Sequence, residues 1–77
     1  MFIRLYDARS EVNMLLSVRE ILAVKDYSPK DEPIDGANSV IMTRPVDSGS
    51  NATHNYFVLE TVSQIETLIL EALELSF

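Results

Sequence analysis

Residues 54–77, HNYFVLETVSQIETLILEALELSF, join a predicted strand to the clearest predicted helix of the chain. The opening of this stretch is rich in aromatic and apolar residues, which predicts a strand over 54–59. Thr61 and Gln64 then have the capping-box spacing, in which each side chain satisfies an unpaired backbone N–H at the start of a helix. No Gly or Pro follows Gly49. We therefore expect a C-terminal helix over 62–75.

Apolar stretches separated by turn residues predict four more strands before this unit. We expect these strands over residues 2–6, 12–16, 20–27 and 39–44. Two loops interrupt them, at 28–37 with two prolines and an Asp35-Gly36 turn signal, and at 46–53 with small polar residues. The order predicts an α+β fold in a single domain, 1–77. A small antiparallel sheet of five strands (hairpin, strand, hairpin) is covered by the one helix.

The third predicted strand carries apolar residues on both faces. Simple alternation places Ile21 and Ala23 on one face and Leu22 and Val24 on the other. One helix covers only one face of a sheet, so the other face is left with apolar side chains.

Composition narrows the classes of protein that fit. The chain has 77 residues, 47% of them hydrophobic, with a mean hydropathy of +0.08, which excludes a disordered tail. No apolar run approaches the roughly 18 residues of a membrane-spanning helix. The chain has no cysteine, which excludes disulfides and thiolate chemistry. The first residues lack the layout of a secretory signal, so we expect a cytoplasmic location.

Charge is distributed unevenly along this small acidic protein. Six Lys and Arg residues oppose twelve Asp and Glu, for a net charge of −6. All six cations lie within residues 1–44, whereas five acids and no cation follow. This balance argues against binding to duplex nucleic acid, which requires several Lys or Arg contacts to phosphates. The acidic end is either a solvated helix face or a functional surface, which meets a basic partner or imitates a nucleic-acid backbone.

The predicted helix is apolar around an unusually wide arc, roughly 220° against the roughly 100° stripe typical of a surface helix. A compact face suited to the sheet comprises Val62, Ile65, Ile69, Ala72 and Leu73. The flanking apolar residues are Leu68, Leu70, Leu75 and Phe77. Together they would form a sticky patch on a monomer, so we expect a homo-oligomer, with a homodimer as the first choice, whose interface uses these four residues. The alternative is a monomer whose last helical turn folds over the sheet edge.

The sequence lacks the motifs of common catalytic centres. It has one histidine, no phosphate-binding glycine loop and no nucleophile elbow, so we expect neither enzymatic activity nor a cofactor or metal site. The polar cluster with binding chemistry is the hairpin between the last two strands. Its candidate ligand-binding residues are Arg44, Ser48, Ser50, Asn51, Thr53 and His54. An arginine with hydroxyls and loop amides can hold a small phosphate-bearing ligand. The alternative is an ordinary exposed hairpin tip.

The order of elements resembles the FlbD family of small bacterial proteins linked to flagellar and swarming motility. The matching stretches are Ile3-Arg4-Leu5, residues 12–16 and 21–24, and above all Tyr56-Phe57-Val58-Leu59-Glu60-Thr61. The last is similar to the family's Tyr-Val-Val-x-Glu-Ser lead into its terminal helix. The chain departs from that family in its long loops and in a helix without cations. The resemblance implies a role in motility or assembly and no catalytic residues.

Three hypotheses about function follow. The leading one is a non-catalytic binding protein that occupies or sequesters a partner, either as a phage-type inhibitor of a host protein or as a sponge for a small nucleotide signal. The second is a FlbD-like motility or assembly accessory protein. The third is a small hydrolase.

Overall fold

The computed structural model describes residues 1–30, 33–44 and 53–75. Its elements, in chain order, are β1 (Phe2–Asp7), β2 (Val12–Ser17), the 3-10 turn η1 (Val18–Glu20), β3 (Ile21–Asp26), β4 (Ser39–Thr43), β5 (His54–Val58) and α1 (Val62–Leu75). The five strands form one antiparallel sheet in the order β2-β1-β5-β4-β3, and α1 packs against it. The predicted α+β fold is confirmed. The strand ends differ from the predicted ones by no more than one residue. Boundaries are the part of an element that a sequence pattern defines least sharply.

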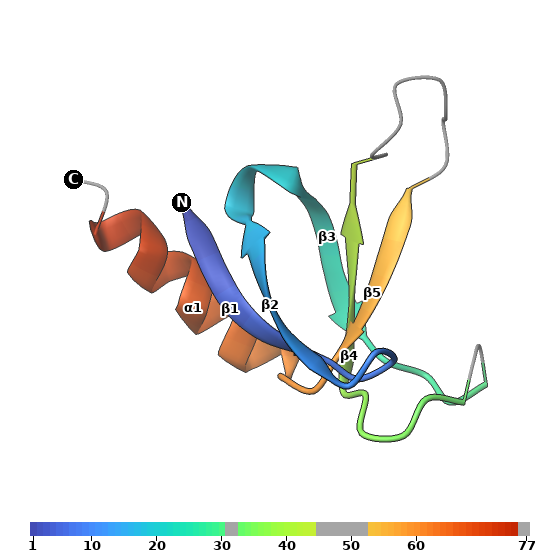
Figure 1. Ribbon diagram of the computed structural model, residues 1–77. Helices are drawn as coiled ribbons and strands as arrows, with labels where there is room; N and C mark the ends of the chain where they lie inside the picture. The colour runs from blue at the N-terminus through green and yellow to red at the C-terminus, as the bar shows by residue number, and fades with distance from the viewer. Residues whose placement is uncertain (31–32, 45–52, 76–77) are drawn as a thin grey trace.

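The sheet consists of two wings that meet at one point. β1 and β5 share a single register pair, Asp7 with Val58. Two backbone bonds flank it, from Ala8 N–H to the Phe57 carbonyl at 2.8 Å and from Leu59 N–H to the Tyr6 carbonyl at 3.0 Å. Beyond this point the β1–β2 hairpin and the β3–β4–β5 wing diverge, and η1 links them at the far end (Figure 1). The helix contacts β1 and β3, one strand from each wing.

The main core lies between the wings and the helix. Its fully or nearly fully buried side chains come from four strands and α1: Ile3, Leu5, Leu16, Ile41, Val58 and Ile65. Ile65, from the helix, is completely buried against the strands. Burial of a side chain of this size stabilises a fold by about 1.5–3 kcal/mol. These residues therefore hold the two wings and the helix together.

The side chains of the third strand point to different faces of the sheet than the sequence predicts, because β3 contains a β-bulge. Ile21 pairs with Thr43 and Ala23 pairs with Met42, so Leu22 is an extra residue that opposes no partner. Val24 then pairs with Ile41 and packs with Ile21 against the core. The prediction that Ile21 shares a face with Ala23, and Val24 with Leu22, was therefore wrong. The strand also begins one residue later than predicted, because Glu20 belongs to η1.

The start of the helix is fixed by the predicted capping box. The Thr61 N–H donates to Gln64 Oε1 at 2.9 Å, and the Gln64 N–H donates to Thr61 Oγ1 at 3.2 Å. The helix occupies residues 62–75, as the sequence predicted. It is too short to cross a lipid bilayer, and no other helix in the described part of the chain could do so.

A second, smaller cluster covers part of the sheet face away from the helix. Val40 and Phe57 pair across β4 and β5 and are both buried. The Tyr27 ring meets Phe57 edge-on at 5.9 Å between centroids, and the Arg9 guanidinium lies 4.7 Å from the centre of the same ring. Tyr27 also accepts a hydrogen bond from the Ile34 N–H at 2.7 Å. The segment that follows β3, with Tyr27 and Ile34, therefore helps to bury apolar side chains that the helix does not reach.

Candidate functional site

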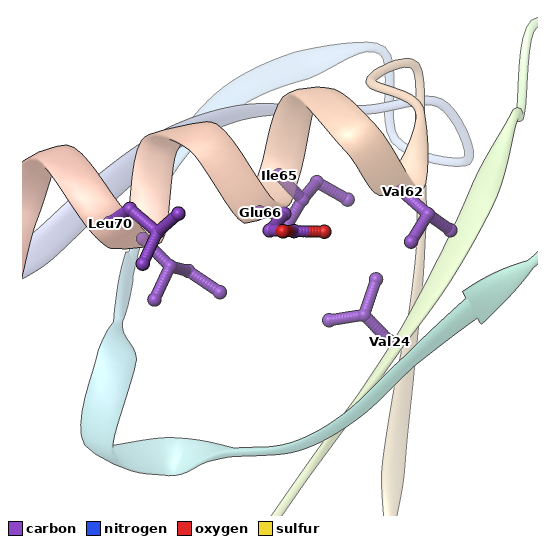
Figure 2. Close-up of a pocket in the computed structure, with 6 residues that line it drawn as sticks. Val24, Val62, Ile65, Glu66 and Leu70 are labelled. Carbon is purple, nitrogen blue, oxygen red and sulfur yellow. The ribbon is translucent and has the colours of Figure 1, made fainter.

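An apolar groove lies between α1 and β3. Its volume is about 240 Å³, and it is lined by Val24, Val62, Ile65, Glu66, Ile69 and Leu70. Figure 2 shows Val24 reaching from the strand toward the helix, with Val62, Ile65 and Leu70 projecting from the helix toward the same space. The β-bulge creates this arrangement, because it turns Val24 rather than Ala23 toward the helix. The groove is therefore built from two elements that the chain brings together only on folding.

The exposed apolar flank of α1 continues from this groove. Leu70 is 53% exposed and lines the groove, so it presents an apolar surface at its mouth. Leu73 is 38% exposed, and the prediction that it belongs to the face covering the sheet was wrong. The helix is rotated so that Leu68, rather than Leu73, packs against the core beside Ile69 and Ala72, which the sequence placed on this face. This rotation leaves the Leu70 side of the helix, rather than the Leu68 side, open to a partner.

The four residues predicted for an oligomer interface therefore have different positions. Leu70 is exposed, whereas Leu68 is partly buried against the core. Leu75 ends α1, and its side chain lies outside the described residues, as does all of Phe77. Leu68 and Leu70 do not form one continuous exposed patch, because they lie on opposite flanks of the buried stripe.

Every charged side chain of α1 is acidic. Glu66 lines the groove, and Glu71 and Glu74 are exposed further along the helix. Two copies of the chain meeting through this helix would bring these carboxylates together, and like charges at close range oppose association. The same carboxylates favour a cationic segment, because opposite charge both steers encounter and stabilises the bound state. The electrostatics of the groove thus suit a basic partner better than a second copy.

The predicted ligand cluster lies at the loop end of the β4–β5 hairpin, beyond the pair of Thr43 and His54. Arg44, Thr53 and His54 are exposed there, whereas Ser48, Ser50 and Asn51 lie outside the described residues. Thr43 pairs with His54, so the alternation of side chains directs Arg44 to one face of the hairpin and His54 to the other. The His54 ring lies 4.3 Å from the ring of Tyr56, two residues along the same face. Arg44 and His54 therefore do not converge on one small ligand, and anion binding by Arg44 stays a prediction.

A second hollow lies on the other flank of the helix. It is open and is lined by Arg4, Glu60, Gln64, Thr67, Leu68 and Glu71. The Glu60 carboxylate is already engaged, because its Oε1 accepts the Tyr6 N–H at 3.0 Å. This bond satisfies the backbone N–H of Tyr6 at the point where β5 diverges from β1. The role of Glu60 is therefore structural, and it lies outside the groove.

Sequence reasoning missed the groove because its residues share no motif. Val24 and Ile69 are ordinary apolar residues, and their neighbourhood depends on the bulge and on helix rotation. Among residues 1–30, 33–44 and 53–75, no group of three or more His, Asp or Glu side chains is placed to hold a metal ion. The FlbD resemblance stays a prediction: no protein-family model, no curated protein and no solved structure matches this chain.

Proposed function

We propose that this protein is a non-catalytic cytoplasmic binding protein that occupies a basic, amphipathic segment of a partner protein. The observation that supports the proposal is the apolar groove between α1 and β3, with the Glu66 carboxylate among its lining residues. A helix laid in such a groove buries its apolar face and keeps its cations toward the surrounding acids. Binding of this kind blocks the partner without any chemical step.

The energetics of the groove are those of a small docking site. An apolar anchor that fills it against Val24 and Leu70 gains about 1.5–3 kcal/mol for a fully buried side chain. The acidic rim adds steering and orientation more than raw affinity. A helix two or three turns long therefore suits the site, with one apolar anchor in the groove and cations beside Glu66.

The proposal covers both an inhibitor of a host protein and an accessory of the FlbD type, since both act by occupying a partner. The two differ in the identity of the partner, and recovery of a defence, transcription or flagellar protein in a pull-down distinguishes them. A sponge for a small nucleotide signal is a different function that requires Arg44 instead of the groove. A rise in melting temperature with a cyclic nucleotide, lost in Arg44→Ala, would favour that function.

A fluorescent model peptide tests the groove directly. The chain contains no tryptophan, so a synthetic amphipathic helix of Leu and Lys with a single Trp reports its own burial by a blue shift in emission. We expect saturable binding that weakens on the order of tenfold in Leu70→Ser, because the substitution removes an apolar contact from the lining of the groove. Glu66→Gln is expected to weaken binding and to reduce its dependence on salt.

The matched control is Glu11→Gln, which removes the same charge from an exposed position in the β1–β2 turn. We expect this variant to bind like the wild type. Equal weakening by Glu11→Gln and Glu66→Gln would show that the peptide senses only net charge. That result, or the lack of saturable binding, would overturn the groove as the docking site.

A further inference from the structure

The two edge strands of the sheet differ in how they are protected. An exposed edge strand offers unpaired N–H and C=O groups to other chains, and proteins blunt such edges with bulges, charged residues or a covering element. β3 has all three, namely the bulge at Leu22, the charged Lys25 and Asp26, and contact with α1. β2 reads VNMLLS, without charge, Pro or Gly, and pairs with β1 over six consecutive residues without a register shift. The β3 edge is therefore protected against pairing with another strand, whereas the β2 edge is a bare edge without such protection.

The backbone of β2 has three residues whose hydrogen-bonding groups face away from β1. The Val18 N–H donates to the Met1 carbonyl at 3.1 Å, so Met1 and Val18 form a hydrogen-bonded pair. In an antiparallel ladder such pairs alternate with non-bonded ones. The outward-facing residues of β2 are therefore Asn13, Leu15 and Ser17.

Three apolar side chains at or beside this edge are exposed. Leu15 is 69% exposed and lies opposite Arg4 on the sheet face that points away from α1. Phe2, 64% exposed, is its diagonal neighbour on that face, because Phe2 pairs with Ser17. Val12, at the start of the strand, is 52% exposed. The bare backbone edge is thus bordered by an apolar surface.

The charge of the β1–β2 hairpin suits contact with a copy of itself. Residues 2–17 contain two arginines and two acids, so the hairpin is neutral within a chain of net charge −6. Two neutral hairpins approach without the repulsion that opposes contact between two acidic helices. A strand of a second copy is therefore the occupant that this edge favours.

We propose that β2 is a dimerisation edge, which pairs antiparallel with β2 of a second copy about a two-fold axis at Leu15. Leu15 then faces Leu15 of the copy, and Asn13 faces Ser17 of the copy. The outward N–H and C=O groups of all three residues are satisfied by the copy. The two five-stranded sheets become one continuous sheet, with an isologous interface as two-fold symmetry requires.

The sequence around Leu15 selects this register. Outward-facing residues pair with one another when the two-fold axis lies at any residue of β2, so the neighbouring registers centre on Met14 or Leu16. A centre at Met14 places Leu15 opposite Asn13 of the copy, and a centre at Leu16 places it opposite Ser17. The next centres, at Asn13 and Ser17, place it opposite Glu11 or Arg19. All of these put a leucine against a polar or charged side chain, whereas the centre at Leu15 places it against its own equivalent. The inference uses neither α1 nor the groove, so it is independent of the proposed function.

Sedimentation velocity across the micromolar range tests the dimer. We expect the wild type to sediment at twice the 8.7 kDa of one chain. Leu15→Lys places two ammonium groups opposite each other and should give the mass of one chain. Leu70→Lys is the matched control, since it puts the same charge on a comparably exposed leucine of α1, and it should leave the dimer intact. Circular dichroism establishes that each variant is folded.

Charge pairing tests the register itself. Leu15→Glu alone should also be monomeric, but an equimolar mixture of Leu15→Lys and Leu15→Glu should restore the dimer, because position 15 faces itself across the axis. Amide exchange should show protection at Asn13, Leu15 and Ser17 in the wild type that is lost in Leu15→Lys. A wild type that stays at the mass of one chain, or dissociation by Leu70→Lys but not by Leu15→Lys, would overturn the proposal. Failure of the mixture to dimerise would overturn the Leu15-centred register.

Discussion

The orientation of α1 can be tested by truncating two of its side chains that lie on different faces. Ile65 is completely buried among the core residues of four strands, whereas Leu70 is 53% exposed. Removal of a fully buried isoleucine costs about 2–5 kcal/mol, from lost burial and from the cavity that remains. The total stability of a domain this size is roughly 4–12 kcal/mol. Ile65→Ala is therefore expected to remove a large share of the free energy of unfolding.

Leu70→Ala should cost less than about 1 kcal/mol, because half of the side chain is already in water and alanine is as good a helix former as leucine. Urea unfolding at fixed protein concentration measures both. With a slope of about 1–2 kcal/mol per molar urea, the midpoint of Ile65→Ala should fall by about 1 M or more. Ile65→Val is the graded control, with an expected loss of about 0.5–1.5 kcal/mol. Equal losses for Ile65→Ala and Leu70→Ala would refute the helix orientation, and with it the position of the groove.

Two local features give further predictions. Thr61→Ala removes the acceptor for the Gln64 N–H and should lower stability by about 0.5–2 kcal/mol in thermal unfolding, and an unchanged melting temperature would contradict the capping box. Glu11 has a φ of 58°, in the left-handed region that costs a non-glycine residue about 1–2 kcal/mol. Glu11→Gly should therefore raise the melting temperature, whereas a fall would show that the Glu11 side chain contributes more than this strain.

The sequence predicts well those elements whose causes are local. Thr61 and Gln64 lie three residues apart, and their reciprocal bonds set the start of α1 where the spacing predicts it. The β1–β2 hairpin likewise follows from two apolar stretches joined by a short polar turn, in which the Asp7 carboxylate accepts the Arg9 N–H at 3.0 Å. Interactions between residues only a few positions apart do not depend on how the rest of the chain folds, so the sequence alone predicts them.

The features that were mispredicted or missed depend on distant partners. Alternation fails in β3 because pairing with β4, across the loop between them, inserts Leu22 as an unpaired residue. Helix periodicity identifies the apolar residues of α1 but not their rotation, so Leu73 was placed toward the sheet although it is exposed. The packing of Tyr27 on Phe57 joins residues thirty positions apart. The groove depends on the first two of these effects, which is why its residues form no recognisable motif.

The uneven distribution of charge separates the two proposed surfaces by their response to salt. Contact between a basic segment and the acidic side of the groove is weakened by added salt, because exposed charges are screened over about 8–10 Å at physiological ionic strength. Pairing between two neutral β2 edges depends on backbone hydrogen bonds and on Leu15, which salt does not screen. A chain whose dimer interface is uncharged and whose partner-binding surface is acidic can remain dimeric at a salt concentration that releases the partner. Because β2 and β3 are opposite edges of one sheet, the proposed dimer would leave both grooves open, and two linked sites would bind a bivalent partner more tightly than either site alone.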